Sequence, residues 1–175
     1  MKRTSIHQRQ ISCQGFLRDD GLWDIEAILT DIKSHSLQTA QRGIIPTGEP
    51  IHNISLKLTL DNDLLIHHAE AKTQNAPFSS CSEVNQSYNQ LVGIKISTGW
   101  NRKVKKLFSG VNGCTHLNEL LPVVATLAIQ TIYPYLEMRP ETAPVNEKRL
   151  NPVLENSCHS FNTQGKNVEN YWPES

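Results

Sequence analysis

The residues best suited to chemistry are a cysteine and a histidine two positions apart, Cys114 and His116, within residues 113–121. A thiolate and an imidazole are preferred ligands of zinc, and both also bind iron. The pair precedes an apolar run with helical spacing. We therefore expect Cys114 at a helix start, where free backbone amides and the helix dipole favour a thiolate. A Cys-x-His pair alone is a weak motif, and a buried cysteine beside a surface histidine is the alternative.

Two residues elsewhere in the chain would complete a tetrahedral metal site. His52 begins a predicted strand, and Cys81 lies in the loop that follows the next strand. If these strands pack on the helix after Cys114, their ends converge on its N-terminus. The predicted ligands of a zinc or iron ion, in whole or in part, are His52, Cys81, Cys114 and His116.

A pair of carboxylates, Asp24 and Glu26, shares one face of another predicted strand. Paired carboxylates perform acid–base chemistry or bind a hard cation. If the protein is a metal-dependent enzyme, the ion would act as a Lewis acid or activate water. Glu26 and Asp24 are then the candidate catalytic residues. A solvated polar face of an edge strand is the alternative interpretation.

Two functions without a metal remain open. In one, Cys114 is the nucleophile of a thiol enzyme, with His116 or His52 as its base. In the other, the protein is a binding or accessory module whose sheet and basic residues 101–107 receive a protein or an anionic small molecule. A solvated helix face explains the same basic residues. The chain has no phosphate-binding glycine loop, G-x-S-x-G or H-E-x-x-H motif, so the enzyme classes that carry them lack support.

Alternation of apolar and polar residues predicts three strands. Residues 22–31 place Trp23, Ile25, Ala27 and Leu29 on one face, although a helix beginning at Asp20 is the rival. Residues 51–60 alternate most clearly, and a turn at 61–63 leads into a returning strand at 64–73. These three strands suggest an antiparallel meander. Residues 1–15 are expected to be irregular or a short strand, and residues 34–50 a loop.

Three helices are predicted after the strands. They cover residues 84–92, closed by Gly93, the basic residues 101–107, and residues 115–136. Thr115 is the expected N-cap of the last helix, and Pro122 should kink it or delay its regular start. The fold class is therefore α+β, with an antiparallel sheet of three to four strands and helices packed on one face.

The composition indicates a single cytoplasmic domain. A length of 175 residues suits about one domain, predicted at residues 1–140. Residues 141–175 form a partly ordered tail, whose Cys158–His159 doublet could fold back on the site. Seventeen basic and seventeen acidic residues cancel, so no nucleic-acid or membrane partner is expected. Neither a signal sequence nor a membrane span is expected, and in such a compartment the four cysteines should stay reduced.

Five blocks of the sequence resemble the signature of an uncharacterised bacterial family of unknown function, over most of residues 7–173. The blocks are Gly15-Phe16-Leu17-Arg18-Asp19-Asp20-Gly21-Leu22-Trp23-Asp24-Ile25-Glu26-Ala27, Pro50-Ile51-His52, Leu91-Val92-Gly93, Gly113-Cys114-Thr115-His116-Leu117 and Cys158-His159. The family pattern has His-Asp where this chain has His52-Asn53. This resemblance implies no settled activity.

A second, more remote resemblance is to the U-type iron–sulfur cluster scaffold proteins, over residues 48–132. Those proteins have a strand pair, a loop thiol, a helical stretch and a cysteine at the start of the last helix. Cys81 and Cys114 match the loop thiol and the last thiol, but Ile51-His52-Asn53 stands where the scaffolds have Cys-Gly-Asp. The resemblance implies a sheet-and-helix layout with a mononuclear zinc or iron site rather than cluster assembly.

Overall fold

The computed structural model describes residues 1–138 and 154–167 of the chain. Two compact units are present, Met1–Thr131 and Ile132–Ser175. The first unit carries the sheet and the site described below, and the two units are described separately.

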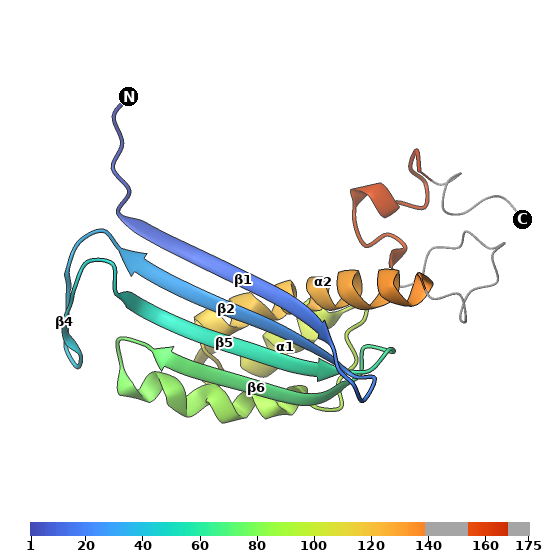
Figure 1. The fold of residues 1–175 in the computed structure, drawn as a ribbon, viewed down its shortest axis with the longest axis horizontal. Helices are drawn as coiled ribbons and strands as arrows, with labels where there is room; N and C mark the ends of the chain where they lie inside the picture. The colour runs from blue at the N-terminus through green and yellow to red at the C-terminus, as the bar shows by residue number, and fades with distance from the viewer. Residues whose placement is uncertain (139–153, 168–175) are drawn as a thin grey trace, which may run out of the picture. The chain divides into compact units, whose positions relative to one another are not determined.

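The first unit is built on a four-stranded antiparallel sheet in the order β1-β2-β5-β6 (Figure 1). The strands are β1 (His7–Leu17), β2 (Trp23–Lys33), β5 (Pro50–Leu60) and β6 (Ile66–Asn75). The α+β class and the meander of three to four strands are therefore confirmed. β1 is longer than the short strand expected in this region. An edge strand that is mostly exposed needs no alternation of apolar and polar residues, so the polar sequence of β1 did not predict its full length.

A small hairpin connects β2 to β5 where the sequence predicted only a loop. Its strands are β3 (Leu37–Thr39) and β4 (Gly43–Ile45). Strands of three residues are too short to show a period in the sequence, so the pattern could not predict them.

The core lies between the inner face of the sheet and the helices that cover it (Figure 1). Alternate residues of β2 and β5 are fully buried on this face, namely Trp23, Ile25, Ala27, Leu29, Ile54, Leu56, Leu58 and Leu60. The covering elements are the 3₁₀ segment η1 (Ser79–Leu91), helix α1 (Trp100–Phe108) and helix α2 (Thr115–Glu137). A short 3₁₀ turn, η2 (Gly110–Asn112), joins α1 to α2. The predicted packing of helices on one face is confirmed.

Helix α2 differs from its prediction at its start. Thr115 is its first helical residue, so the N-cap position falls on Cys114, whose carbonyl accepts the Asn118 amide at 2.9 Å. The helix runs without interruption from Thr115 to Glu137, so Pro122 does not delay its start, and a kink at Pro122 stays a prediction. Pro122 removes one helical hydrogen bond, and its side chain lies on the exposed side of the helix.

α2 is also long and apolar enough to cross a membrane, which the sequence analysis did not expect. Its residues Leu117, Leu120, Leu121 and Val124 are buried, as in the core helix of a soluble domain. The cytoplasmic location stays a prediction.

The second unit contains the short 3₁₀ turn η4 (His159–Phe161). There the Asn156 amide donates to the Phe161 carbonyl at 2.9 Å, and Cys158 is exposed. Most of the predicted tail 141–175 lies outside the described residues, so its folding back on the site stays a prediction.

Candidate functional site

One carboxylate, Asp31, is buried on the inner face of the sheet at the C-terminal end of β2. Its side chain is 1% exposed. The period of β2 turns Asp31 to the same side as Leu29, toward the helices. Strand pairing then sets Arg9 of β1 on one side of Asp31 and His52 of β5 on the other. A charged group in this position must be paired to be tolerated.

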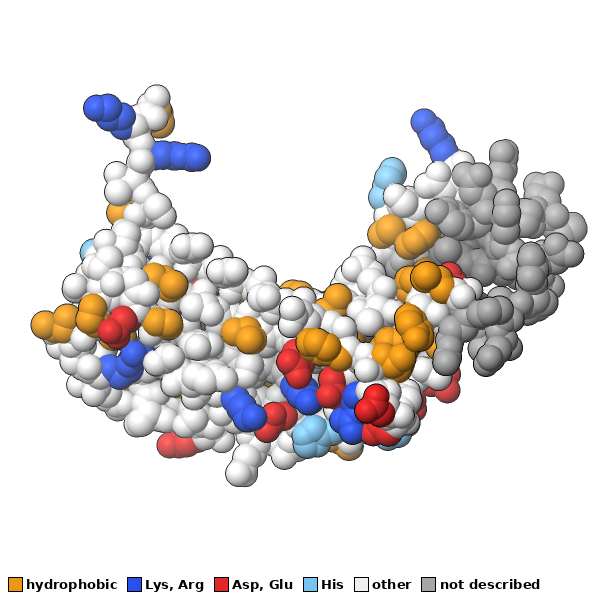
Figure 2. Space-filling view, in the orientation of Figure 1, with side chains coloured by type: hydrophobic (Ala, Val, Ile, Leu, Met, Phe, Trp, Pro, Cys, Tyr) orange, Lys and Arg blue, Asp and Glu red, His pale blue; other side chains and the backbone are white. Residues whose placement is uncertain are grey.

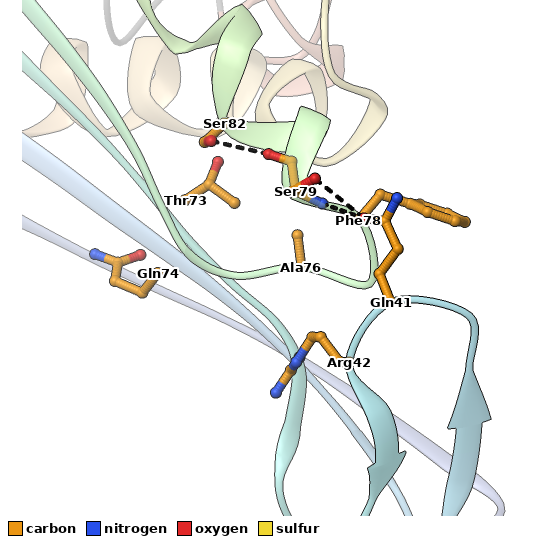
Figure 3. Close-up of a pocket in the computed structure, with 8 residues that line it drawn as sticks. All are labelled: Gln41, Arg42, Thr73, Gln74, Ala76, Phe78, Ser79 and Ser82. Atoms are coloured by element: carbon orange, nitrogen blue, oxygen red, sulfur yellow. Dashed lines mark hydrogen bonds between the residues drawn. The ribbon is translucent and has the colours of Figure 1, made fainter.

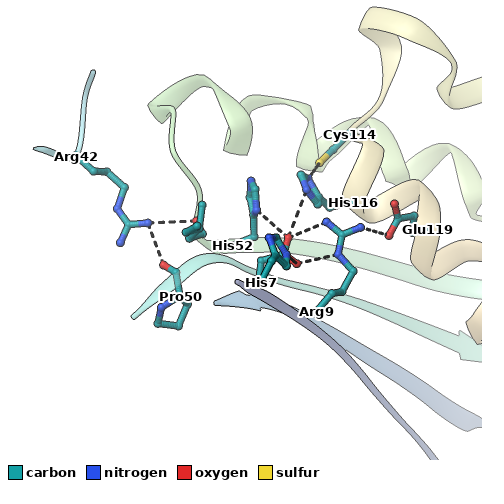
Figure 4. A network of polar contacts seen from close by, with 10 residues as sticks. His7, Arg9, Arg42, Pro50, His52, Cys114, His116 and Glu119 are labelled. Atoms are coloured by element: carbon teal, nitrogen blue, oxygen red, sulfur yellow. Dashed lines mark hydrogen bonds and ion pairs between the residues drawn. The ribbon is translucent and has the colours of Figure 1, made fainter. Parts of the chain in front are cut away.

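Three side chains from neighbouring strands pair with Asp31 (Figure 4). Arg9 donates two hydrogen bonds, from Nε to Oδ1 and from Nη2 to Oδ2, both at 2.8 Å. His7 Nε2 lies 3.0 Å from Oδ1, and His52 Nδ1 lies 3.0 Å from Oδ2. The third guanidinium nitrogen, Nη1, donates to Glu119 of α2 at 2.6 Å. Asp31 is therefore the centre of a network that ties β1, β2 and β5 together.

Helix α2 brings its first turn to the same carboxylate. His116 Nε2 lies 3.7 Å from Asp31 Oδ2, and the His116 ring lies against the His52 ring, tilted by 34° with centroids 3.8 Å apart. The other ring nitrogen, Nδ1, lies 3.8 Å from Cys114 Sγ. A row of neighbouring side chains therefore leads from the helix start to the buried carboxylate, in the order Cys114, His116 and Asp31.

The start of α2 is held in place by contacts with η1 and α1. The buried hydroxyl of Tyr88 accepts the backbone N–H of Cys114 at 3.0 Å and lies 2.7 Å from Asn118 Oδ1. The Asn118 amide donates to the Phe108 carbonyl at 2.8 Å. A Cβ on Gly113 would lie 2.4 Å from that same carbonyl oxygen, so only glycine fits there. These contacts fix the backbone that carries Cys114 and His116.

The network sets the charges of the site. Burial would raise the pKa of Asp31, but hydrogen bonds from Arg9 and His7 outweigh burial and hold that pKa well below its usual range. Burial lowers the pKa of His52, and the nearby His116 lowers it further. Burial and the charge of Arg9 lower the pKa of His116. At neutral pH the site therefore presents a carboxylate and two neutral imidazoles.

Asp31, His52 and His116 form a group that could hold a metal ion, because one ligand atom from each lies within 4.8 Å of the others. Among the described residues this group brings together two of the four predicted ligands, His52 and His116. Cys114 lies beside His116, but at the nitrogen that points away from Asp31. Cys81 is half-buried in η1 and does not belong to the group. Metal binding stays a prediction for all four residues.

The predicted catalytic carboxylates lie elsewhere. Asp24 and Glu26 alternate with the buried residues of β2, so they face the opposite side of the sheet from Asp31. Asp24 accepts a hydrogen bond from Thr59 at 2.7 Å and pairs with Lys57 at 2.9 Å. Burial would raise the pKa of Asp24, but these two hydrogen bonds outweigh it and lower that pKa. The fold does not bring this pair to the Asp31 group.

The basic residues of α1 also keep to the surface. Helix α1 buries Trp100, Val104 and Phe108 and exposes its four cations, which are Arg102, Lys103, Lys105 and Lys106. Their role in binding an anionic partner stays a prediction.

Sequence reasoning missed Asp31 itself and its two partners from β1, Arg9 and His7. A signal existed for Asp31, because it continues the period-two series of the apolar face of β2 beyond Leu29. A carboxylate in that register is unusual and predicts a buried, paired charge. Arg9 and His7 gave no signal, since their places depend on the pairing of β1 with β2.

The β3–β4 hairpin supports the strand that carries His52. Arg42 donates from Nη1 to the carbonyls of Pro50 and Ile51, each at 3.2 Å. Beside it, a polar cavity of about 240 Å³ lies between the hairpin and the start of η1 (Figure 3). Gln41 closes one side by accepting hydrogen bonds from the amide and hydroxyl of Ser79. The hairpin therefore fixes the position at which β5 begins.

Comparison with known proteins gives a family but no activity. No curated protein and no solved structure matches the chain, so the resemblance to the U-type iron–sulfur scaffolds gains no support and stays a prediction. A family model described as "Protein of unknown function (DUF2889)" matches residues 7–130, the part of the chain that contains every member of the Asp31 network. The chain belongs to this family of unknown function, as the sequence blocks predicted.

Proposed function

We propose that the protein binds one divalent transition-metal ion, zinc or iron(II), through Asp31, His52 and His116. The observation that carries the proposal is the convergence of two imidazoles and one carboxylate within 4.8 Å. Two histidines and one carboxylate are a common ligand set for both metals, and they leave positions open for water or a substrate. This set replaces the two cysteines of the sequence prediction with Asp31.

The distances suit a shared ion. Ligand atoms about 2.1 Å from one metal ion lie roughly 3.0–3.4 Å from one another in octahedral or tetrahedral geometry. The observed separations from Asp31 Oδ2 are 3.0 Å to His52 Nδ1 and 3.7 Å to His116 Nε2. One ligand atom from each of the three residues lies within 4.8 Å of the others, so we expect side-chain rotations to place all three around one ion.

The protonation states and the accessibility also suit metal binding. A metal needs a charged carboxylate and neutral imidazoles, and the lowered pKa values of Asp31, His52 and His116 provide both at neutral pH. The two histidine side chains are 15% and 22% exposed, so an ion can reach them from solvent. Cys114 then accepts the hydrogen bond of the second His116 nitrogen, a partner that metal-bound histidines usually have.

Arg9 is the residue that competes with the ion, because it holds both oxygens of Asp31. Its guanidinium already bonds Glu119 through Nη1 at 2.6 Å. When an ion takes Asp31 Oδ2, Arg9 keeps Oδ1 and Glu119 as acceptors. The guanidinium therefore stays paired, and the ion does not leave it buried without a partner.

Titration of the tag-free, chelator-treated protein with zinc or cobalt(II), followed by calorimetry, tests the proposal. We expect one ion per chain and at least about 100-fold weaker binding in Asp31→Asn, His52→Ala and His116→Ala, because losing an outer partner alone costs roughly 10- to 100-fold. His67→Ala is the matched control. His67 also pairs with an aspartate, at 2.9 Å from Asp61, but lies outside the group.

Results of two kinds would contradict the proposed ligand set. One is absence of binding in the wild-type protein, or equal binding in His52→Ala. The other is complete loss of binding in Cys114→Ser or Cys81→Ser with retention in Asp31→Asn, which would favour the cysteine-containing set.

A second candidate function is thiol chemistry at Cys114. The observation that favours it is the order Cys114, His116, Asp31, with 3.8 Å from Sγ to Nδ1 and 3.7 Å from Nε2 to Oδ2. A thiol, a base and a group that orients the base are the parts of an activated nucleophile.

Alkylation with iodoacetamide near neutral pH, followed residue by residue by mass spectrometry, tests this candidate. The exposed Cys158 serves as the internal reference. An activated Cys114 is alkylated faster than Cys158 although it is less exposed, and it loses that advantage in His116→Ala. Slower labelling of Cys114 than of Cys158 would exclude activation.

A further inference from the structure

The two edges of the sheet differ in whether their outer backbone groups are hydrogen-bonded. At the β6 edge, residues 93–96 add backbone hydrogen bonds: Ile66 donates to Ile94 at 3.0 Å and Gly93 donates to Ile66 at 2.8 Å. The opposite edge is β1, which pairs only with β2. Among residues 1–138 and 154–167, no backbone hydrogen bond reaches its outer side. We propose that this edge pairs with β1 of a second copy of the chain, antiparallel and around a two-fold axis.

β1 has few of the features by which edge strands avoid pairing, because its one inward-pointing charge is neutralised by two carboxylates. Its register with β2 is continuous from His7 to Leu17, with neither a bulge nor a proline. Its one permanent charge, Arg9, turns inward to Asp31 and Glu119. Figure 2 shows largely uncharged surface along β1, while charged side chains gather over the lower strands. A long edge strand with regular pairing and no outward-facing permanent charge is a template for another strand.

An apolar groove of about 440 Å³ runs beside this edge, between β1 and α2. It is lined by Cys13, Pro122, Val123, Thr126, Leu127 and Gln130. Ile11, the neighbour of Cys13 on the same strand face, is 38% exposed. Pairing of the strand alone would leave this groove open, whereas a second copy brings its own α2 and β1 face to cover it. The occupant that fits the edge and the groove together is a whole domain.

The charges of the chain favour a second copy as that domain. A two-fold axis near Ser12 sets Arg9 opposite Gly15 and His7 opposite Leu17, so no like charges oppose each other. The net formal charge is zero, so two copies do not repel each other at long range. An edge about 36 Å long and two layers, or about 20 Å, deep offers on the order of 700 Å² per copy, close to the roughly 800 Å² that stable interfaces bury.

Analytical ultracentrifugation of the full chain at tens of micromolar tests the proposal. We expect a species of twice the chain mass. In the triple variant Gln10→Lys, Ser12→Lys, Gln14→Lys we expect a monomer, because the six lysines meet across the axis in any register near Ser12. These three side chains are exposed and lie on the outer face, away from the Asp31 network.

The matched control adds three lysines elsewhere, at the exposed positions Gln86, Asn89 and Asn101. This variant should remain dimeric, and circular dichroism should show that both variants keep the fold. A monomeric wild type would overturn the proposal, even if the strand captured an extended peptide of another protein. A β1 variant that stays dimeric, a control that dissociates, or open-ended association would overturn it as well.

Discussion

At the scale of single residues, the protein places its most unusual group, the Asp31 carboxylate, where a strand would ordinarily bury an apolar side chain. Two hydrogen bonds from Arg9 and contacts with His7 and His52 make this position tolerable. Such a network is sensitive to the loss of its central charge, because each partner is then left with an unmatched polar group.

We expect Asp31→Asn to lower the free energy of unfolding by about 3 kcal/mol, since it breaks a pair whose carboxylate is buried and leaves Arg9 with the partly exposed Glu119 as its remaining carboxylate partner. Urea unfolding followed by circular dichroism measures the change. Glu26→Gln is the control on the same strand. Its carboxylate is exposed and lies 3.6 Å from Lys57, so it should change stability by less than about 0.5 kcal/mol. Equal effects of the two substitutions would show that the network does not stabilise the fold.

Stability should fall in two steps as the pH falls. The pKa values of His52 and His116 are lowered in the folded state, so the unfolded chain takes up protons first and stability declines below about pH 6.5. The pKa of Asp31 is also lowered, so stability declines again below about pH 4, through protonation of the unfolded carboxyl. Urea unfolding at a series of pH values should show the upper step weakened in His52→Gln. A wild-type profile that is flat between pH 7 and pH 5 would contradict it.

At this scale the sequence predicted site residues whose side-chain type is itself a signal, such as histidine and cysteine. It did not predict residues whose position depends on the register between strands. Histidines and cysteines near element ends stood out, and the fold places His52 against His116. The places of Arg9 and His7 follow from the strand partners of β1, and a polar edge strand carries no period from which to derive them.

At the scale of elements, the critical feature is the tight turn that leads from α1 into α2. Gly113 packs against the Phe108 carbonyl, which also accepts a hydrogen bond from Asn118, and the Tyr88 hydroxyl accepts the backbone N–H of the next residue, Cys114. Helices and strands of the core were predictable because their apolar periods are regular. The start of α2 was misplaced at Thr115 as the N-cap because that choice depends on backbone contacts, not on side-chain type alone.

Gly113→Ala should therefore disturb the site as well as the fold. A Cβ would lie 2.4 Å from a backbone oxygen that cannot rotate away, and overpacking of this kind costs about 1–3 kcal/mol. We expect a lower melting temperature and a weaker zinc affinity, because Cys114 and His116 shift together. Val111→Ala, nearby and 98% exposed, should be neutral. A Gly113→Ala variant with normal stability and normal zinc affinity would show that the backbone of the turn shifts enough to accept a Cβ, and would contradict this prediction.

At the scale of the whole molecule, all members of the network fall within the family match at residues 7–130. The first compact unit ends at Thr131, inside α2, and the second carries none of these residues. The sequence predicts that the tail at 141–175 could fold back on the site. The effect of the tail on metal affinity can be measured directly.

A chain that ends at Met138, and so keeps all of α2, should bind zinc within about twofold of the full-length affinity, because every proposed ligand lies before residue 120. Calorimetry measures the affinity, and thermal unfolding checks that the transition stays cooperative. A large loss of affinity in a folded, truncated chain would instead assign the tail a part in the site.

The meander also determines when the candidate site forms during folding. Asp31 and His52 are 21 residues apart and meet when β5 pairs with β2. His116 belongs to an element much later in the chain, and closing such a long loop is the slower event. The tilted pair of histidine rings therefore forms only when α2 docks on the sheet, so we expect it to be among the last contacts made during folding.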